Sequence, residues 1–259
     1  MPVELLLPVP ALLGGLLVLA RVAGAVSIVP LPGREAFPAA ARIVLAAAIT
    51  AVLFPFWPAV SAGELGPLAL VVLLLPEIAF GLTIGLAVSL LNEAFVLASQ
   101  IFGLQAGYGY AATIDPATQA DSSVLQILAH LSAGLLFFSA GLDREVIRTF
   151  ALSLEAWPPG AYAVTPALAE TLVRAGAVMF STAVRLALPV VGLLLLVDVS
   201  LALLGRINSQ LQLLMLAFPA KMLASVALLA AVSAALPALY GFAARPLMGL
   251  LKELAAGAG

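Results

Sequence analysis

Six ionisable residues lie within or against strongly apolar segments of this sequence of 259 residues, and their chemistry needs an explanation first. They are Arg21, Glu77, Glu93, Arg185, Asp198 and Lys221. A charge at the centre of a bilayer costs roughly 2.5–3.5 kcal/mol on insertion scales, so such residues seldom face lipid. We therefore expect them either to pair with one another inside a helical bundle, or to line a polar path and pair with neighbouring subunits.

The residue types that enzymes use are sparse in this chain. The single histidine, His130, has Gln126 and Gly134 at the i−4 and i+4 positions of its expected helix, so we interpret it as a helix-packing residue. The sequence has no cysteine, no nucleophile elbow and no glycine-rich phosphate loop. Asp115 has no second aspartate in the setting that a membrane aspartyl protease needs. We expect no catalytic residue, no metal site and no cofactor.

The elements that position these residues must be membrane helices. The chain is 64% hydrophobic and 9% charged, with a mean hydropathy of +1.20, and a soluble core could not hide so much apolar surface. Four uncharged stretches reach the roughly 20 residues that a helix needs to cross about 30 Å of hydrocarbon. These stretches are residues 43–63, 94–114, 122–142 and 222–244. Three more apolar runs tolerate an occasional charge, namely residues 5–31, 65–91 and 175–205.

The sequence therefore predicts an all-α integral membrane protein with six to seven long apolar helices in a single domain, residues 1–259. Charges, prolines and a glycine concentrate in residues 143–174, which we expect to form the main extramembrane loop. A second break, residues 103–121, combines glycines with Asp115, Pro116 and Asp121, and it is typical of an irregular or re-entrant segment.

The number of spans between residues 65 and 114 decides the predicted orientation. We favour two spans that meet in a tight hairpin near Asn92 and Glu93. With that count, Arg206 alone stands opposite the other basic residues outside the spans, and the positive-inside rule places the C-terminus in the cytoplasm and the N-terminus outside. With one continuous span the bias becomes weak.

Small residues and prolines indicate close, bent packing. Gly81 and Gly85 form a small-xxx-small pair that lets another backbone approach one face of a helix. Prolines inside apolar runs each free a backbone carbonyl and favour a kink. They are Pro30, Pro55, Pro76, Pro189, Pro219 and Pro237.

One stretch carries a family resemblance. Residues 103–111, Gly-Leu-Gln-Ala-Gly-Tyr-Gly-Tyr-Ala, followed by Asp115-Pro116, resemble the central signature of the FliR family of flagellar protein-export channel subunits. The similarity continues upstream through Arg21, Pro30, Gly33, Pro38, Pro55, Glu77, Gly81 and Gly85, and downstream through residues 135–138, Gly141, Ser153, residues 158–160 and residues 217–221. The chain departs from the family pattern at Asp143, where a histidine is usual, and at Ser209, Gln210 and Gln212.

The resemblance implies a structural subunit of the type III export gate in the bacterial inner membrane, at the flagellar basal body. Its implied partners are FliP and FliQ homologues in a hetero-oligomeric helical assembly, other export-apparatus membrane proteins, unfolded exported proteins as substrates, and membrane lipid. The net charge of −2 gives no polybasic surface for nucleic acid. The injectisome homologue is the nearest related alternative. A proton-coupled or small-molecule transporter is the alternative from another class, because isolated membrane carboxylates and broken helices are typical of it.

Two groups of residues have expected roles, the first implied by the resemblance and the second expected mainly from the cost of unpaired charges and from close helix packing. The resemblance implies a plug-like loop over residues 105–121 that closes the channel, with Gln105, Gly107, Tyr108, Gly109, Tyr110, Ile114, Asp115 and Pro116 as its plug residues. Small residues there allow tight packing and the aromatic residues supply bulk, although a packed re-entrant turn without a gating role is the alternative. Subunit assembly or intramembrane charge pairing is expected of Arg21, Glu77, Gly81, Gly85, Glu93, Arg185, Asp198, Arg206, Phe218, Pro219 and Lys221.

Overall fold

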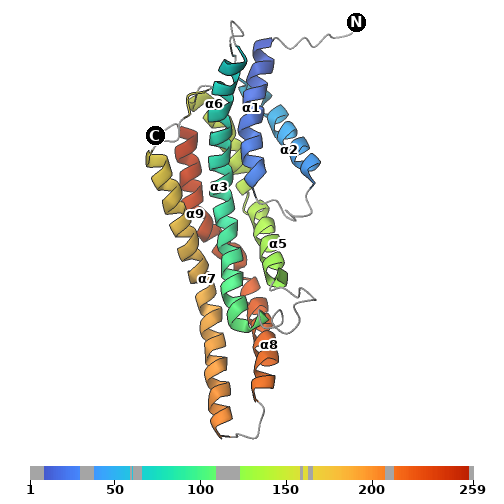
Figure 1. Cartoon of the computed structure of the whole chain (residues 1–259), viewed down its shortest axis with the longest axis vertical. Coiled ribbons are helices and arrows are strands. Elements are labelled where there is room, and N and C mark those ends of the chain that lie inside the picture. The colour runs from blue at the N-terminus through green and yellow to red at the C-terminus, as the bar shows by residue number, and fades with distance from the viewer. Residues whose placement is uncertain are drawn as a thin grey trace. The chain divides into compact units, whose positions relative to one another are not determined.

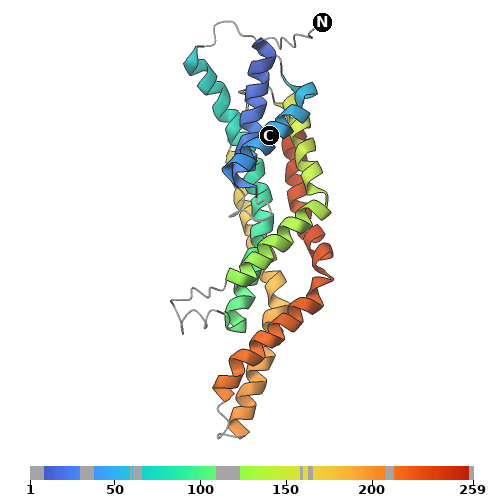
Figure 2. The same ribbon diagram turned by 90° about the vertical axis from the view of Figure 1, so that its right-hand side faces the viewer.

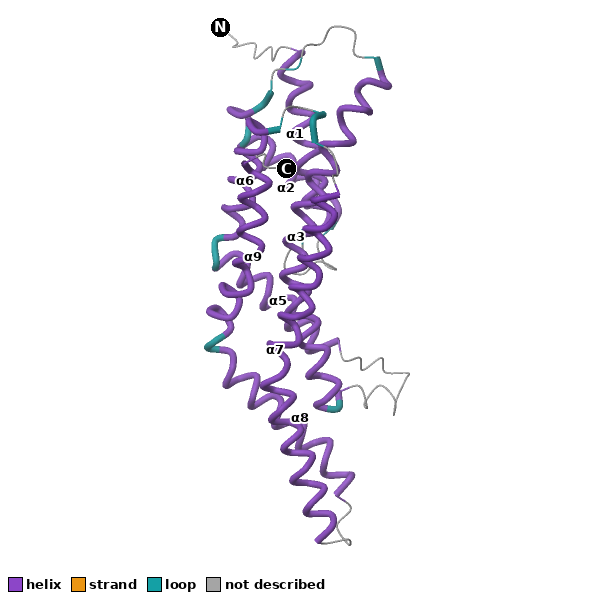
Figure 3. The backbone as a smooth tube through the Cα atoms, turned by 90° about the vertical axis from the view of Figure 1, so that its left-hand side faces the viewer, coloured by secondary structure: helices purple, strands orange, loops and turns teal. Residues whose placement is uncertain are grey.

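The computed structural model describes residues 9–29, 38–58, 60, 66–108, 123–157, 160–162, 166–207 and 213–256. Within these residues every regular element is a helix and no strand occurs (Figure 3). The helices labelled in Figure 1 are α1 (Val9–Ile28), α2 (Ala39–Val52), α3 (Pro67–Ala106), α5 (Ser123–Ser139), α6 (Leu142–Ala156), α7 (Pro166–Ile207), α8 (Leu213–Ser233) and α9 (Leu236–Ala256). A 3-10 helix, η1 (Phe54–Phe56), follows α2.

Several of these helices are long and apolar enough to cross a membrane. Three qualify singly, and they are Val9–Ile28, Leu68–Ala106 and Leu172–Ile207. Two bent pairs qualify when each pair is counted as one span, and they are Leu125–Ser139 with Leu142–Ala156 and Pro219–Ser233 with Leu236–Ala256. The described part of the chain thus holds three to five candidate spans, and the predicted all-α membrane protein is confirmed.

The helices divide into two compact units. Unit 1 consists of Met1–Leu90, Phe137–Ala175 and Ala244–Gly259, and unit 2 consists of Leu91–Leu136 and Gly176–Ala243. Helices α3, α5, α7 and α9 each contribute residues to both units. The single domain expected over residues 1–259 stays a prediction.

The predicted hairpin near Asn92 and Glu93 is wrong. Helix α3 continues through both residues without interruption. Neither residue breaks a helix as glycine or proline does, and the buried Asn92 side chain accepts a hydrogen bond of 2.7 Å from the Tyr240 hydroxyl. A polar residue in an apolar run therefore marked a buried hydrogen bond rather than a turn. The orientation that was inferred from two spans loses its basis with the hairpin.

Two other predicted stretches are divided in the structure. The stretch 43–63 contains a helix only to Val52, where η1 with Pro55 follows. The Trp57 indole donates a 3.0 Å hydrogen bond to the carbonyl of Thr50, which satisfies an acceptor in the last turn of α2. The stretch 222–244 is interrupted between Ser233 and Leu236, where α8 ends and α9 begins.

Most of the segment 143–174 is helical rather than loop. Helix α6 fills its first part and α7 begins at Pro166, a residue that the first turn of a helix tolerates well. Helix α6 is amphipathic, with Val146 and Phe150 buried and Arg144 and Arg148 exposed. Its predicted place outside the membrane stays a prediction.

Close packing between α1 and α3 organises unit 1. Figures 1 and 2 show α1 beside α3, whose first turns lean away from α1 in Figure 2. A Cβ atom on Gly81 would meet the carbonyl oxygen of Arg21, and one on Gly85 would lie 2.7 Å from that of Ala25. The approaching backbone that this glycine pair predicted belongs to α1 of the same chain. Helix α2 also packs against α1.

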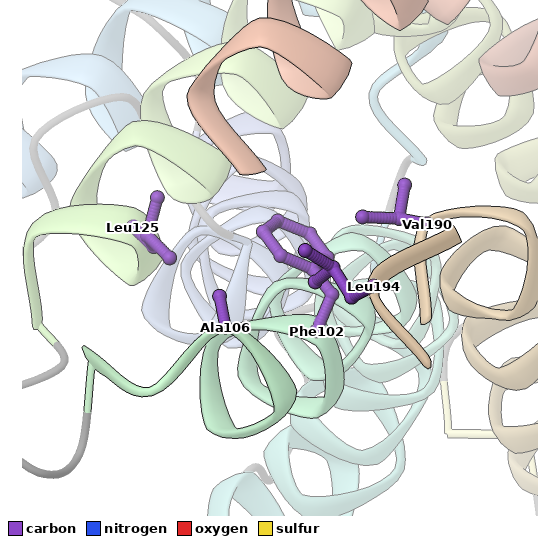
Figure 4. Close-up of a cluster of buried hydrophobic side chains, with 5 residues drawn as sticks. All are labelled: Phe102, Ala106, Leu125, Val190 and Leu194. Carbon is purple, nitrogen blue, oxygen red and sulfur yellow. The ribbon is translucent and has the colours of Figure 1, made fainter. Parts of the chain in front are cut away.

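An apolar cluster from three helices forms the core of unit 2. Phe102 and Ala106 of α3, Leu125 of α5, and Val190 and Leu194 of α7 are buried together (Figure 4). Helix α8, which runs beside α7 in Figures 1 and 2, adds partly buried side chains to this cluster. The C-terminal end of α3 is therefore held by packing against α5, α7 and α8.

Candidate functional site

A buried ion pair lies at the centre of unit 1. The Arg21 Nε atom of α1 donates a 2.6 Å hydrogen bond to Glu77 Oε2 of α3, and each side chain is 1% exposed. An unpaired charge would be very costly at either position, because neither water nor lipid headgroups can reach it. Two of the six charges singled out from the sequence thus meet within one chain.

Each remaining nitrogen or oxygen atom of this pair has one hydrogen-bond partner in a neighbouring group. Arg21 Nη1 donates to the Ser153 hydroxyl at 2.8 Å, and Arg21 Nη2 donates to the Trp157 carbonyl at 3.4 Å. The Gly160 amide donates to Glu77 Oε1 at 3.1 Å. We call these five residues, Arg21, Glu77, Ser153, Trp157 and Gly160, the Arg21 cluster. It joins α1 and α3 to α6 and to the connection between α6 and α7.

Aromatic rings enclose the Arg21 cluster. The guanidinium carbon of Arg21 lies 4.5 Å from the centre of the Phe80 ring, a cation–π distance. Tyr162 packs edge-to-face against Phe80 and against Trp157, with ring centres 4.9 and 5.6 Å apart. Burial raises the pKa of Tyr162, against the opposing effects of its 2.9 Å hydrogen bond with Thr83 and of the Arg21 charge. The Tyr162 phenol is therefore neutral, and it is held beside the cluster by its ring contacts and its hydrogen bond with Thr83.

A second polar centre lies in unit 2. Lys221 of α8 pairs with Asp198 of α7, with Nζ 2.9 Å from Oδ1 and 3.0 Å from Oδ2. Gln105 of α3 donates to the same Oδ2 atom at 2.9 Å. We call Gln105, Asp198 and Lys221 the Asp198 cluster. Lys221 is only 13% exposed and Asp198 36% exposed, so the pair is partly shielded.

The predicted plug begins beside the Asp198 cluster. Helix α3 ends after Ala106, and Gly107 has a φ of 88°, which glycine adopts freely. The Tyr108 and Ser225 hydroxyls are hydrogen-bonded at 3.3 Å. The other predicted plug residues lie outside the described residues, and they are Gly109, Tyr110, Ile114, Asp115 and Pro116.

The remaining predicted assembly residues are not brought into either cluster. Arg185 is exposed on α7 and Glu93 is half-buried on α3, and neither meets an opposite charge within the described ranges. Arg206 is exposed in the last turn of α7, where a cation complements the helix dipole. Phe218 and Pro219 belong to α8, which continues through the proline. The assembly roles of all these residues stay predictions.

Several residues that complete the clusters had no predicted role. Ser153 and Gly160 entered only as parts of a family pattern, and Trp157 and Tyr162 were not singled out. The signal that could have found Trp157 and Tyr162 is their polar N–H and O–H groups within an apolar chain, since a buried Trp or Tyr usually has a hydrogen-bond partner. Among the described residues, no three His, Cys, Asp or Glu side chains gather as metal ligands.

Comparison with known proteins agrees with this architecture. Residues 12–245 match the family described as bacterial export proteins, family 1. The flagellar biosynthetic protein FliR of Escherichia coli K12 is 29% identical over 213 residues, which cover 82% of this chain and 81% of that protein. The FliR protein of Pectobacterium carotovorum is 29% identical over 199 residues, covering 77% and 76%, and that of Caulobacter vibrioides is 25% identical over 219 residues, covering 83% and 86%. Because the family match spans most of a helical, membrane-embedded chain, this protein belongs to the bacterial export proteins, family 1, as a member of the FliR family of flagellar export proteins.

Proposed function

We propose that this chain is a structural channel subunit of the flagellar type III export apparatus in the bacterial inner membrane. Together with FliP and FliQ homologues it would form the gate through which unfolded flagellar proteins are secreted. The quoted relatives all carry the flagellar name, which supports the flagellar branch over the injectisome branch. Other export-apparatus membrane proteins are expected around this gate.

One observation carries the proposal of a multi-subunit assembly. The candidate span Leu172–Ile207 has a mean hydropathy of 2.5, yet only 17% of its most apolar stretch of 18 residues is buried within this chain. Leucines and a phenylalanine are exposed along this helix, including Phe180, Leu188 and Leu203. Water cannot solvate such a surface at low cost, so other protein chains or lipid must cover it. Neighbouring subunits of an assembly would cover this surface with protein, which is consistent with the proposal.

Purification of the tagged chain from membranes tests this assembly. We expect two other membrane proteins, the FliP and FliQ homologues, to co-purify in fixed ratios and to be identified by mass spectrometry. A chain that purifies alone and exchanges a small solute in liposomes would be a transporter, and that result would overturn the proposal.

The segment that follows Gly107 is proposed to plug the closed channel. Gly107→Val places a β-branched residue at a φ of 88°, where a non-glycine residue costs roughly 1–2 kcal/mol. That strain is enough to shift a closed–open equilibrium by about tenfold. We therefore expect a raised ion leak or altered secretion, measured in cells, with a normal amount of assembled complex.

Gly66→Val is the matched control for this variant. Gly66 precedes α3 and an added Cβ atom there meets nothing within 4 Å, so leak and secretion should stay at the wild-type level. Wild-type leak together with wild-type secretion in the Gly107→Val complex would reject the plug and favour a packed turn.

A further inference from the structure

Three helices of unit 2 meet at one carboxylate. Asp198 Oδ2 on α7 accepts hydrogen bonds from Gln105 of α3 at 2.9 Å and from Lys221 of α8 at 3.0 Å, while Oδ1 lies 2.9 Å from the same ammonium group. Of these three side chains, Gln105 and Lys221 are far from each other in sequence, and Asp198 is the group that both contact. Removal of Asp198 therefore breaks both connections at once.

The position of Gln105 gives this contact a direct consequence for the chain path. Gln105 lies in the last turn of α3, two residues before the left-handed Gly107. The Gly107 amide still donates to the Leu104 carbonyl at 3.2 Å, so the turn that leaves the helix is built on the residue that precedes Gln105. Tyr108 then makes its own hydrogen bond with Ser225 of α8 at 3.3 Å.

The apolar core of unit 2 and the Asp198 cluster both contact the last turns of α3. The apolar cluster holds Phe102 and Ala106 without directional preference, because dispersion contacts fix distance better than direction. The charge-assisted bond from Gln105 to Asp198 has a preferred geometry and therefore favours one rotation of the last turn of α3, while Lys221 holds the carboxylate in place. The direction in which the chain leaves α3 at Gly107 follows from that rotation.

We infer that Asp198 is a positioning residue, which fixes the last turn of α3 and thereby the direction in which the chain continues through Gly107 and Tyr108. The consequence for channel closure rests on the proposed function. The consequence for the geometry of α3 does not, and the two can be measured separately.

The geometric part is tested in the purified complex with paired spin labels. The chain contains no cysteine, so Leu104→Cys and Val199→Cys, at positions 72% and 50% exposed, provide two labelling sites. We expect one narrow distance distribution in the otherwise unchanged chain. Asp198→Asn should raise the share of a second distance about tenfold, equivalent to about 1.4 kcal/mol, because the bonds from Gln105 and Lys221 both lose their charged acceptor.

Three further variants separate positioning from general damage. The reciprocal exchange Asp198→Lys with Lys221→Asp restores an ion pair and should return the distribution toward the narrow form. Glu170→Gln, in the exposed pair of Glu170 with Arg174, should leave it unchanged. If the Asp198→Asn chain does not assemble into the complex, the distance distribution of Gln105→Leu decides, since this variant removes only the bond between Asp198 and α3.

An unchanged distribution in the deciding variant, or no recovery in the exchanged pair, overturns the inference. Co-purification of the partners then separates the inference from the proposed function. Partners that co-purify together with an unaltered α3 geometry would reject the role of Asp198 alone. A broadened distribution in a chain that has no FliP or FliQ partner would reject the channel subunit while retaining the positioning role.

Discussion

Replacing Arg21 with methionine is expected to destabilise the protein by about 3–5 kcal/mol, the usual effect of removing one member of a buried ion pair. The reason is the Glu77 carboxylate, which would keep a single amide donor, Gly160, in a site that is 1% exposed. The Ser153 hydroxyl and the Trp157 carbonyl would lose a donor in the same step. The measurement is the thermal midpoint of the purified complex, followed by intrinsic fluorescence, together with the amount of complex recovered from membranes.

Two comparisons decide whether the buried charge is the cause. The double variant Arg21→Met with Glu77→Met leaves no buried charge and should recover most of the loss, because apolar residues of similar volume can replace a buried pair. Glu170→Gln breaks the exposed pair with Arg174, whose side chains are 71% and 74% exposed, and should change stability by less than about 1 kcal/mol. A double variant as unstable as Arg21→Met would contradict this explanation.

The location of this pair also changes how a loss of assembly should be interpreted. Arg21 and Glu77 satisfy each other inside one chain, so their removal disturbs the fold of unit 1 before it can affect a neighbouring subunit. A reduced yield of complex in Glu77→Gln would therefore accompany a lowered thermal midpoint. A reduced yield at an unchanged midpoint would indicate that Glu77 contacts a partner directly.

Gly81→Leu is expected to separate α1 from α3 and to lower stability by about 3 kcal/mol or more, at the upper end of overpacking effects. A Cβ atom at this position would meet the carbonyl oxygen of Arg21 and the amide nitrogen of Ala25, which are backbone atoms and cannot rotate away. The displaced α1 would also carry Arg21 away from Glu77. The expected readout is a large fall in the thermal midpoint and in the protease resistance of α1.

Gly192→Leu is the control for this substitution. Gly192 lies in α7, where an added Cβ atom meets nothing within 4 Å, and leucine favours a helix more than glycine does. Its thermal midpoint should match or exceed that of the wild-type protein. Equal losses from Gly81→Leu and Gly192→Leu would show that close packing against α1 is not what position 81 requires.

The error at Asn92 shows what apolar periodicity can and cannot predict. A polar residue within an apolar run has two physical explanations, a turn that reaches water or a buried hydrogen-bonding partner. Its partner, Tyr240, lies 148 residues away in the sequence. No local pattern in the sequence contains that information, so the sequence alone could not distinguish a turn from a buried hydrogen bond at Asn92.

The charged residues show the same division between local and distant information. The cost of burying Arg21, Glu77, Asp198 and Lys221 could be read from their apolar surroundings, and with it the need for partners. The sequence did not reveal which positive charge pairs with which negative charge, because Arg21 and Glu77 are separated by 56 residues and Asp198 and Lys221 by 23. Arg185 and Glu93 satisfied the same criteria and meet no opposite charge in the described ranges.

Two properties of this protein could be predicted from its amino-acid sequence alone, namely the apolar surroundings of its helices and the family to which it belongs. Apolar content leaves lipid or other protein chains as the only surroundings for these helices, and the glycine-rich signature at residues 103–111 identifies the FliR family. Tertiary structure alone decided that Gly81 and Gly85 face α1, that α3 is continuous, and that Asp198 joins α3 to α8. Solvent preference is a sum over single residues and is readable along the chain, whereas pairing depends on which helices are brought together in space.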